Sequence, residues 1–165
     1  MSQSITARPR RPWAGILIPV AVVIAVSILG QIATFPNIAP WYQGLNKPPF
    51  NPPNWIFGPV WTTLYGLMAF AAIRIHRLPR SADTRRALTL FYGQLALNAA
   101  WSWMFFAAHS PLLGLINIVP QLALVIATAV AFYRIDRLAG IAIAPLALWV
   151  GFATLLNASV WWLNG

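Results

Sequence analysis

Five continuous apolar runs divide the chain, and none of them contains a charged residue. They cover residues 13–34, 56–73, 87–108, 112–133 and 138–163. At a rise of about 1.5 Å per residue, the first run spans roughly 33 Å, enough to cross a hydrocarbon core of about 30 Å. The strands of a membrane barrel would alternate apolar and polar residues, which these runs do not. The pattern predicts an all-α membrane protein, with residues 1–165 forming one bundle of five transmembrane helices.

The composition supports this class and excludes several others. Hydrophobic residues make up 59% of the chain and charged residues only 8%, which is too little charge to coat a water-facing domain. The absence of cysteine excludes a disulfide scaffold and thiol chemistry. The only two carboxylates, Asp83 and Asp136, fall between apolar runs, so we expect solvated loop charges without an acid–base role. No metal site and no required cofactor are predicted.

The basic residues predict an orientation in the membrane. The formal net charge is +9, but basic and aromatic residues do not interleave as they would on a nucleic-acid-binding surface. One basic residue, Lys47, lies between the first two runs, whereas the other ten share one predicted side of the membrane. They are Arg8, Arg10, Arg11, Arg74, Arg77, Arg80, Arg85, Arg86, Arg134 and Arg137. The basic side should be cytoplasmic, so we expect a multi-pass bacterial membrane protein with its N-terminus inside and its C-terminus outside.

The segment between the first two runs, residues 35–55, has an unusual composition. It holds six prolines, which make it stiff and extended. An ordinary linker is one interpretation, but the segment also carries aromatic side chains that are costly to expose. We therefore predict a lid over one end of the bundle, with these residues as its contacts: Trp41, Tyr42, Lys47, Phe50 and Trp55.

Tryptophan placement indicates what lies beneath this lid. On the predicted topology, seven of the nine tryptophans fall in the outer half of the bilayer, namely Trp41, Trp55, Trp61, Trp101, Trp103, Trp161 and Trp162. Interfacial aromatic belts occur at both membrane surfaces, so a belt alone does not explain this bias. Some of them, especially Trp161 and Trp162 at the end of the last run, are expected to anchor the helix at the interface. The remainder predict an aromatic pocket that suits a flat, conjugated, apolar ligand.

Polar residues inside the runs predict the walls of this pocket. Gln94, Asn98, Trp101 and Phe105 recur on one helical face, as do Trp149, Ala153 and Asn157, while Trp61 and Tyr65 are one turn apart. Amides in hydrocarbon are costly unless paired, so Asn98 and Asn157 are candidates for pairing between helices. Contact with a ligand is the alternative, and the two roles are compatible.

Three blocks of residues resemble the translocator protein family, also called TspO or tryptophan-rich sensory proteins. The first block is Trp41-Tyr42, Leu45, Lys47-Pro48, Phe50, Pro52-Pro53, Trp55, Phe57, Val60-Trp61 and Leu64-Tyr65. The second is Gln94-Leu95, Asn98, Trp101-Ser102 and Phe105-Phe106, and the third is Pro145, Trp149, Phe152-Ala153 and Leu156-Asn157. The chain departs from the family at Leu146, where many members have tyrosine. It also lacks the C-terminal pattern associated with steroid binding in animal members.

The resemblance implies a membrane sensor or carrier for porphyrins, such as protoporphyrin or haem, that also takes isoquinoline-carboxamide and benzodiazepine-type drugs. The implied ligand-binding residues are Tyr42, Trp61, Tyr65, Asn98, Trp101, Trp149 and Ala153. A light- and oxygen-dependent porphyrin-degrading enzyme is the alternative, with Trp61 and Trp149 as the redox-active indoles. A proton-coupled exporter is disfavoured, because no run contains a titratable carboxylate or basic side chain.

Two further features of the sequence carry predictions. His76 is expected to be an exposed loop residue, and His109 a polar turn residue rather than an axial haem ligand. Ala96 and Ala100 form a small-xxx-small pair on the face of the third run opposite Asn98. Such a stripe lets two helices approach closely in a bilayer, so it predicts a homodimer through this face.

Overall fold

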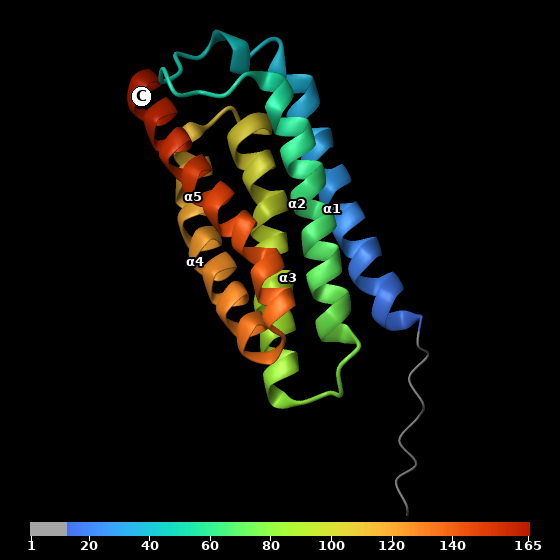
Figure 1. Ribbon diagram of the computed structural model, residues 1–165. Coiled ribbons are helices and arrows are strands. Elements are labelled where there is room, and N and C mark those ends of the chain that lie inside the picture. The colour runs from blue at the N-terminus through green and yellow to red at the C-terminus, as the bar shows by residue number, and fades with distance from the viewer. Residues whose placement is uncertain (1–12) are drawn as a thin grey trace, which may run out of the picture.

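The structure is a computed structural model that describes residues 13–165, and the described chain is helical throughout, without strands. Five long helices run side by side, and a short loop covers the end of the bundle where the C-terminus lies (Figure 1). The elements are α1 (Ala14–Ile38), the 3₁₀ turn η1 (Tyr42–Gly44), α2 (Asn54–His76), α3 (Ala82–Ser102), the π-helical turn η2 (Trp103–Ala107), α4 (Pro111–Ile135) and α5 (Arg137–Asn164). The predicted all-α bundle is confirmed.

Four of the described helices, α1, α2, α4 and α5, are long and apolar enough to cross a membrane. The remaining long helix, α3, differs because its first turns contain Asp83, Arg85 and Arg86. By length and composition, the described residues therefore support an integral multi-pass membrane protein with at least four spans.

The start of α3 lies five residues before the predicted one, because a capping box begins the helix in a polar segment. The backbone N–H of Thr84 donates to Ser81 Oγ at 3.1 Å, and the backbone N–H of Ser81 donates to Thr84 Oγ1 at 2.8 Å. This reciprocal pair satisfies two donors that a helix end otherwise leaves free. Arg85 and Arg86 thus belong to α3 rather than to a loop. The apolar run, which begins at residue 87, identifies only the part of α3 that is apolar enough to lie in hydrocarbon.

The loop between α1 and α2 is shorter than the predicted lid segment, residues 35–55. Helix α1 continues past Pro36 to Ile38, and α2 begins at Asn54, so Trp55 belongs to α2. The connecting residues, 39–53, are called the lid loop below.

At its other end, α2 extends to His76, which is half-buried and hydrogen-bonds Tyr92 (2.7 Å between Nε2 and the phenol oxygen). The prediction of an exposed loop histidine is therefore wrong.

Asp136 caps α5 and pairs with Arg74 at the end of α2, instead of being a solvated loop charge as predicted. Its Oδ1 accepts from the backbone N–H of Ala139 at 3.1 Å and so caps α5. Its Oδ2 accepts from Arg74 Nε at 2.8 Å, within an ion pair that fixes the end of α2 to the α4–α5 turn. The hydrogen bond from Arg74 holds the pKa of Asp136 below its usual range, so the carboxylate is ionised at neutral pH. The adjacent Arg137 donates through Nε to the Tyr133 hydroxyl at 3.2 Å.

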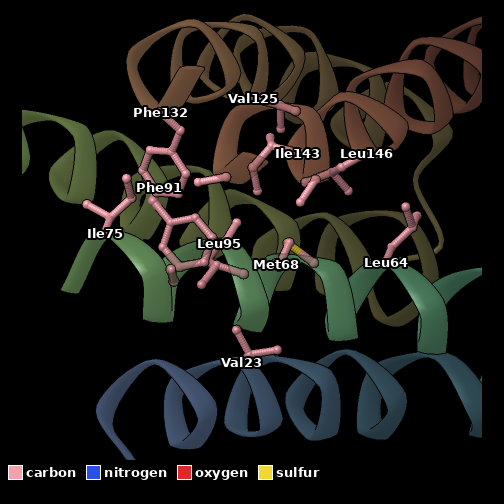
Figure 2. Packing of buried hydrophobic residues seen from close by; sticks show 14 of the residues in the cluster. Val23, Leu64, Met68, Ile75, Phe91, Leu95, Val125, Phe132, Ile143 and Leu146 are labelled. Carbon is pink, nitrogen blue, oxygen red and sulfur yellow. The ribbon is translucent and has the colours of Figure 1, made fainter. Parts of the chain in front are cut away.

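The half of the bundle nearest this charged surface has a solid core. Phe91 of α3 stacks on Phe132 of α4 with ring centroids 5.7 Å apart, and both side chains are fully buried. Figure 2 shows these rings facing each other, with Ile75 and Leu95 beside them. Close packing of this kind leaves little room for a ligand. The deep pocket and the groove described next lie in the other half, beneath the lid loop.

Candidate ligand-binding site

Two adjoining cavities lie beneath the lid loop. A deep pocket of about 80 Å³ extends between α3, α4 and α5, and a groove of about 720 Å³ runs between α1 and α2. Six residues line both cavities: Tyr42, Phe57, Trp61, Asn98, Trp101 and Phe106. Ligand-binding cavities typically measure about 300–1,000 Å³. The groove has the size of a ligand site, and the deep pocket is an extension of it that admits only a small group.

All seven residues predicted to bind ligand lie around these cavities. Tyr42, Trp61, Asn98 and Trp101 line both of them, Tyr65 lines the groove, and Trp149 and Ala153 line the deep pocket. They come from the lid loop and from α2, α3 and α5. The helical periodicity therefore identified faces that the fold brings together.

The two asparagines that were predicted to pair between helices, Asn98 and Asn157, do so. Tyr65 of α2 donates its hydroxyl to Asn98 Oδ1 of α3 at 2.9 Å, while Trp101 of α3 donates its indole N–H to Asn157 Oδ1 of α5 at 3.0 Å. Asn157 also donates through Nδ2 to the carbonyl of Pro111 at 2.7 Å. Because Asn98 and Asn157 also line the deep pocket, the residues that pair between helices are also part of the cavity wall.

The π-helical turn η2 directs two adjacent phenylalanines inward. The backbone N–H of Ala108 donates to the carbonyl of Trp103 at 2.8 Å, a five-residue step that widens the turn. Phe105 and Phe106 are both buried, whereas Trp103 faces outward. Phe105 also stacks on Trp101, with ring centroids 5.0 Å apart and planes at 18°. This wide turn was not predicted, because helical periodicity assumes 3.6 residues per turn.

Tyr42 is the residue of the lid loop that reaches the site. Its ring packs against Phe105 and Phe106, and its hydroxyl donates to Asn51 Oδ1 at 3.1 Å. The Lys47 ammonium lies 4.7 Å from the centre of the same ring and donates to the carbonyls of Gln43 and Leu45 in the lid backbone. Burial raises the pKa of the Tyr42 phenol, so this hydroxyl stays protonated at neutral pH and can donate.

The lid loop is fastened to α5 at two points. The backbone N–H of Asn46 donates to Asn164 Oδ1, and Asn164 Nδ2 donates to the carbonyl of Asn46, both at 2.9 Å. Phe50 packs edge-on against Phe152 of α5, with ring centroids 6.3 Å apart. These contacts close the end of the bundle above the deep pocket.

A third attachment joins Trp41 to the α3–α4 turn. Its ring stacks on His109 with centroids 4.8 Å apart and planes at 15°, and it meets the edges of Phe105 and Phe106. His109 has a left-handed backbone (φ 51°), a strained conformation for a side-chain-bearing residue, and bonds Asn37 Oδ1 through Nε2 at 2.7 Å. Trp41 thus behaves as a lid contact, as predicted from its sequence position.

The tryptophan bias has two structural causes. Four of the seven tryptophans predicted in the outer half are exposed, as expected for side chains that anchor helix ends at a membrane interface: Trp55, Trp103, Trp161 and Trp162. Trp55 is 73% exposed on α2, so its predicted role as a buried lid contact is wrong, although it lines the rim of the groove. Trp61 and Trp101, together with Trp149, face the cavities. The predicted aromatic pocket therefore uses fewer tryptophans than their count indicated.

Contributions from α1 and α4 were missed. Ser27, Gln31 and Thr34 of α1 line the groove, and Ile118 and Gln121 of α4 line the deep pocket. The spacing of the three polar residues on α1, one turn apart each, was the available signal. It is weak because Ser and Thr occur widely in membrane helices, where their hydroxyls bond the preceding turn, as Thr34 does to the carbonyl of Gly30 at 2.8 Å.

The cavity walls offer no ligand for haem iron from histidine, cysteine or methionine among the described residues. His109 stacks on the lid loop outside both cavities. Among the described residues, no three histidine, cysteine, aspartate or glutamate side chains lie close enough together to hold a metal ion. The aromatic walls and the few polar groups of the site suit a ligand held by stacking and by hydrogen bonds.

A helical membrane bundle with an aromatic cavity beneath a proline-rich lid defines the structural class of this protein. Residues 17–163 match the TspO/MBR family, and the chain belongs to that family. It is 37% identical over 145 residues to the tryptophan-rich protein TspO of Archaeoglobus fulgidus, covering 88% of this chain and 94% of that protein. It is 39% identical over 124 residues to the human translocator protein, covering 73% of each chain. The tryptophan-rich sensory protein of Cereibacter sphaeroides is also 39% identical over 124 residues, covering 75% of this chain and 77% of that protein.

Replacing Gly114 by alanine should disturb the deep pocket. A Cβ at Gly114 would lie 2.7 Å from Asn157 Oδ1 and 2.9 Å from Phe105 Cδ2. Asn157 cannot move away without losing its bonds to Trp101 and Pro111. We expect Gly114→Ala to destabilise the protein by about 1–3 kcal/mol in thermal unfolding in detergent, as overpacking usually does.

The matched control for this variant is Gly151→Ala on α5, where a Cβ would meet no atom within 4 Å. This control should be neutral or slightly stabilising, because alanine favours a helix by up to about 1 kcal/mol over glycine. Equal unfolding temperatures for the two variants would show that α4 can move away from α5 at Gly114 without loss of stability.

Proposed function

We propose that this protein is a membrane sensor or carrier that binds porphyrins and isoquinoline-carboxamide-type molecules in the groove between α1 and α2. The observation that carries the proposal is the groove itself, with a volume of about 720 Å³ and an aromatic wall that continues into the deep pocket. Related proteins bear the names translocator protein and tryptophan-rich sensory protein. Those names agree with a role in binding or sensing within a membrane.

The chemistry of the wall favours a flat conjugated ligand with polar groups at its edge. Trp61 and Tyr65 present rings 5.5 Å apart and tilted by 32°, against which a macrocycle can stack. Asn98 and the Tyr65 hydroxyl offer hydrogen bonds at mid-depth. Gln31 and Thr34 of α1 and Asn54 of α2 also line the groove, and they can meet the carboxylates of a porphyrin.

Access to the groove runs from the bilayer in this proposal. The lid loop is fastened to α5 and to the α3–α4 turn, which closes the water-facing end. On α1, Ile24, Ile28 and Phe35 line the groove and are each more than half exposed on the surface that faces lipid. Porphyrins partition into membranes because most of their surface is apolar, so a lateral opening meets the ligand where it is concentrated.

The proposed topology has five spans, with the N-terminus inside and the lid loop outside. The charge-free part of α3, together with η2, runs from Ala87 to Ala107, long enough to cross about 30 Å of hydrocarbon. Because the chain has no cysteine, single cysteines can report on this topology. With a membrane-impermeant thiol reagent, Ala108→Cys should be labelled in intact cells and Asp83→Cys only after permeabilisation. Labelling of both from one side would mean that α3 does not cross.

Ligand binding can be measured by quenching of the intrinsic tryptophan fluorescence of the purified protein. Titration with protoporphyrin in the dark should quench fluorescence in a saturable manner, because Trp61, Trp101 and Trp149 line the cavities. An isoquinoline carboxamide added before the titration should reduce the quenching by protoporphyrin, because both are proposed to bind the same site. Absence of saturable quenching by protoporphyrin would refute the proposed function.

A second candidate function, porphyrin degradation under light and oxygen, is favoured by two indoles that face the same pocket, Trp61 and Trp149. Trp61→Phe and Trp149→Phe keep aromatic walls, so they should weaken dark binding at most about tenfold. If the protein degrades porphyrin, both variants should lose light-dependent bleaching, measured by absorbance, while Trp162→Phe retains it. Trp162 is 80% exposed and lines neither cavity. Equal bleaching in all forms and without protein would assign it to bulk photochemistry.

The proposed homodimer uses the lipid-facing side of α3. Ala96 is exposed and Ala100 half-buried, on the side of α3 away from Asn98. Ala96→Leu with Ala100→Leu should convert a dimer to a monomer in mild detergent, measured by light scattering, because the larger side chains keep the helices apart. Porphyrin quenching should persist in the monomer. A dimer that survives both substitutions rules out this interface, and a folded monomer that has lost quenching would place the ligand between protomers.

A further inference from the structure

A third cavity lies at the opposite end of the bundle from the lid loop. It is an open pocket of about 520 Å³ between the end of α2 and the start of α3. Its walls combine two arginines, Arg80 and Arg85, with the apolar side chains of Ile75, Leu78 and Leu88. A pocket that is cationic at one end and apolar along its wall is typical of a site for an anionic amphiphile.

The two arginines have no counter-ion in the described part of the chain. The sequence contains two carboxylates, and Asp136 is engaged by Arg74. Asp83 forms no ion pair in the described residues and does not line the pocket. Arg80 and Arg85 are both exposed, so their guanidinium groups can reach an outside ligand. Residues 1–12 do not offer a partner of opposite charge, because their only charged side chains are Arg8, Arg10 and Arg11.

The pocket extends from the charged surface toward the hydrocarbon. Tyr92 lies seven residues after Arg85 on α3, which places it roughly 10 Å further along the helix axis. Its hydroxyl bonds His76 Nε2 at 2.7 Å, so polar groups continue partway into the pocket. Ile75, Leu78 and Leu88 line the same pocket, so a phosphate at the arginines would have apolar side chains beside it for attached acyl chains.

We propose that this pocket binds an anionic phospholipid of the leaflet that contacts the basic loops. Arg80 and Arg85 hold the phosphate through charge-assisted hydrogen bonds, and Leu78 and Leu88 contact the acyl chain. Neither the lid loop nor the groove between α1 and α2 takes part, since no residue lining this pocket lines the other two cavities. The lipid site is independent of the proposed porphyrin site.

The test compares two double variants that each remove two positive charges from the same region. Arg80→Gln with Arg85→Gln removes the arginines that line the pocket, whereas Arg77→Gln with Arg86→Gln removes two exposed arginines that do not. The probe is phosphatidylglycerol added to the full-length protein in neutral detergent, with bound lipid measured by native mass spectrometry. Wild type should retain phosphatidylglycerol in preference to phosphatidylcholine. The first double variant should bind it roughly thirtyfold more weakly, and the second within a few-fold of wild type.

Three results would overturn the proposal. Equal loss of lipid in both double variants would indicate diffuse charge attraction, and equal retention of phosphatidylcholine would indicate an apolar surface. Thermal protection by inorganic phosphate equal to that by phosphatidylglycerol would indicate a site for a soluble anion.

Thr89→Trp provides a second variant that keeps every arginine and fills the pocket from an exposed position. It should also lose the lipid, while porphyrin quenching, measured on each variant, reports that the bundle is folded.

Discussion

In the hydrocarbon core, no water is present to pair with a buried polar atom, so each such atom needs a partner within the protein. Asn157, beneath the lid loop, meets this constraint through both atoms of its side-chain amide. From α5 it accepts the indole N–H of Trp101 on α3 and donates to the carbonyl of Pro111 at the start of α4. The absence of a side chain at Gly114 lets α4 come close enough for this contact. The same bonds orient Trp101 in the cavity wall, so the cohesion of three helices and the shape of the site have one cause.

Side-chain size explains why the space between α3 and α4 is filled near the charged surface, whereas a groove opens between α1 and α2 beneath the lid loop. Near the charged surface, Phe91, Phe132 and other large side chains fill the space between α3 and α4. Beneath the lid loop, α1 and α2 face each other through small residues, including Ser27 and Gly30 on α1 and Gly58 and Thr62 on α2. Small side chains cannot fill the gap between two helices, and α1 instead approaches α3, where Gly30 lies against Ser102. The groove between α1 and α2 follows from this choice of residues.

The sequence was sufficient to predict what depends on periodicity alone. The five helices and the inward faces that carry Trp61, Asn98, Trp101 and Trp149 follow from apolar runs and helical spacing. Features that depend on particular hydrogen bonds were missed, such as the Ser81 cap that starts α3 early and the wide turn that buries Phe106. The exposure of Trp55 was also missed, because composition does not distinguish a tryptophan in an interfacial belt from one in a pocket. The contribution of α1 required the tertiary structure, since a groove belongs to two helices.

In the proposed function, the closed lid and the open groove together determine whether the site equilibrates with ligand in water or with ligand in the bilayer. A site open to water would respond to dissolved ligand, whereas a groove that faces acyl chains equilibrates with ligand already in the bilayer. For an apolar macrocycle the membrane concentration is much the higher of the two, because its apolar surface leaves water. Modest affinity then suffices for occupancy, and stacking with a few hydrogen bonds supplies it without a metal ligand. In the proposed function, the fastened lid loop keeps water from Asn98 and Asn157, which preserves their pairing whether or not a ligand is bound.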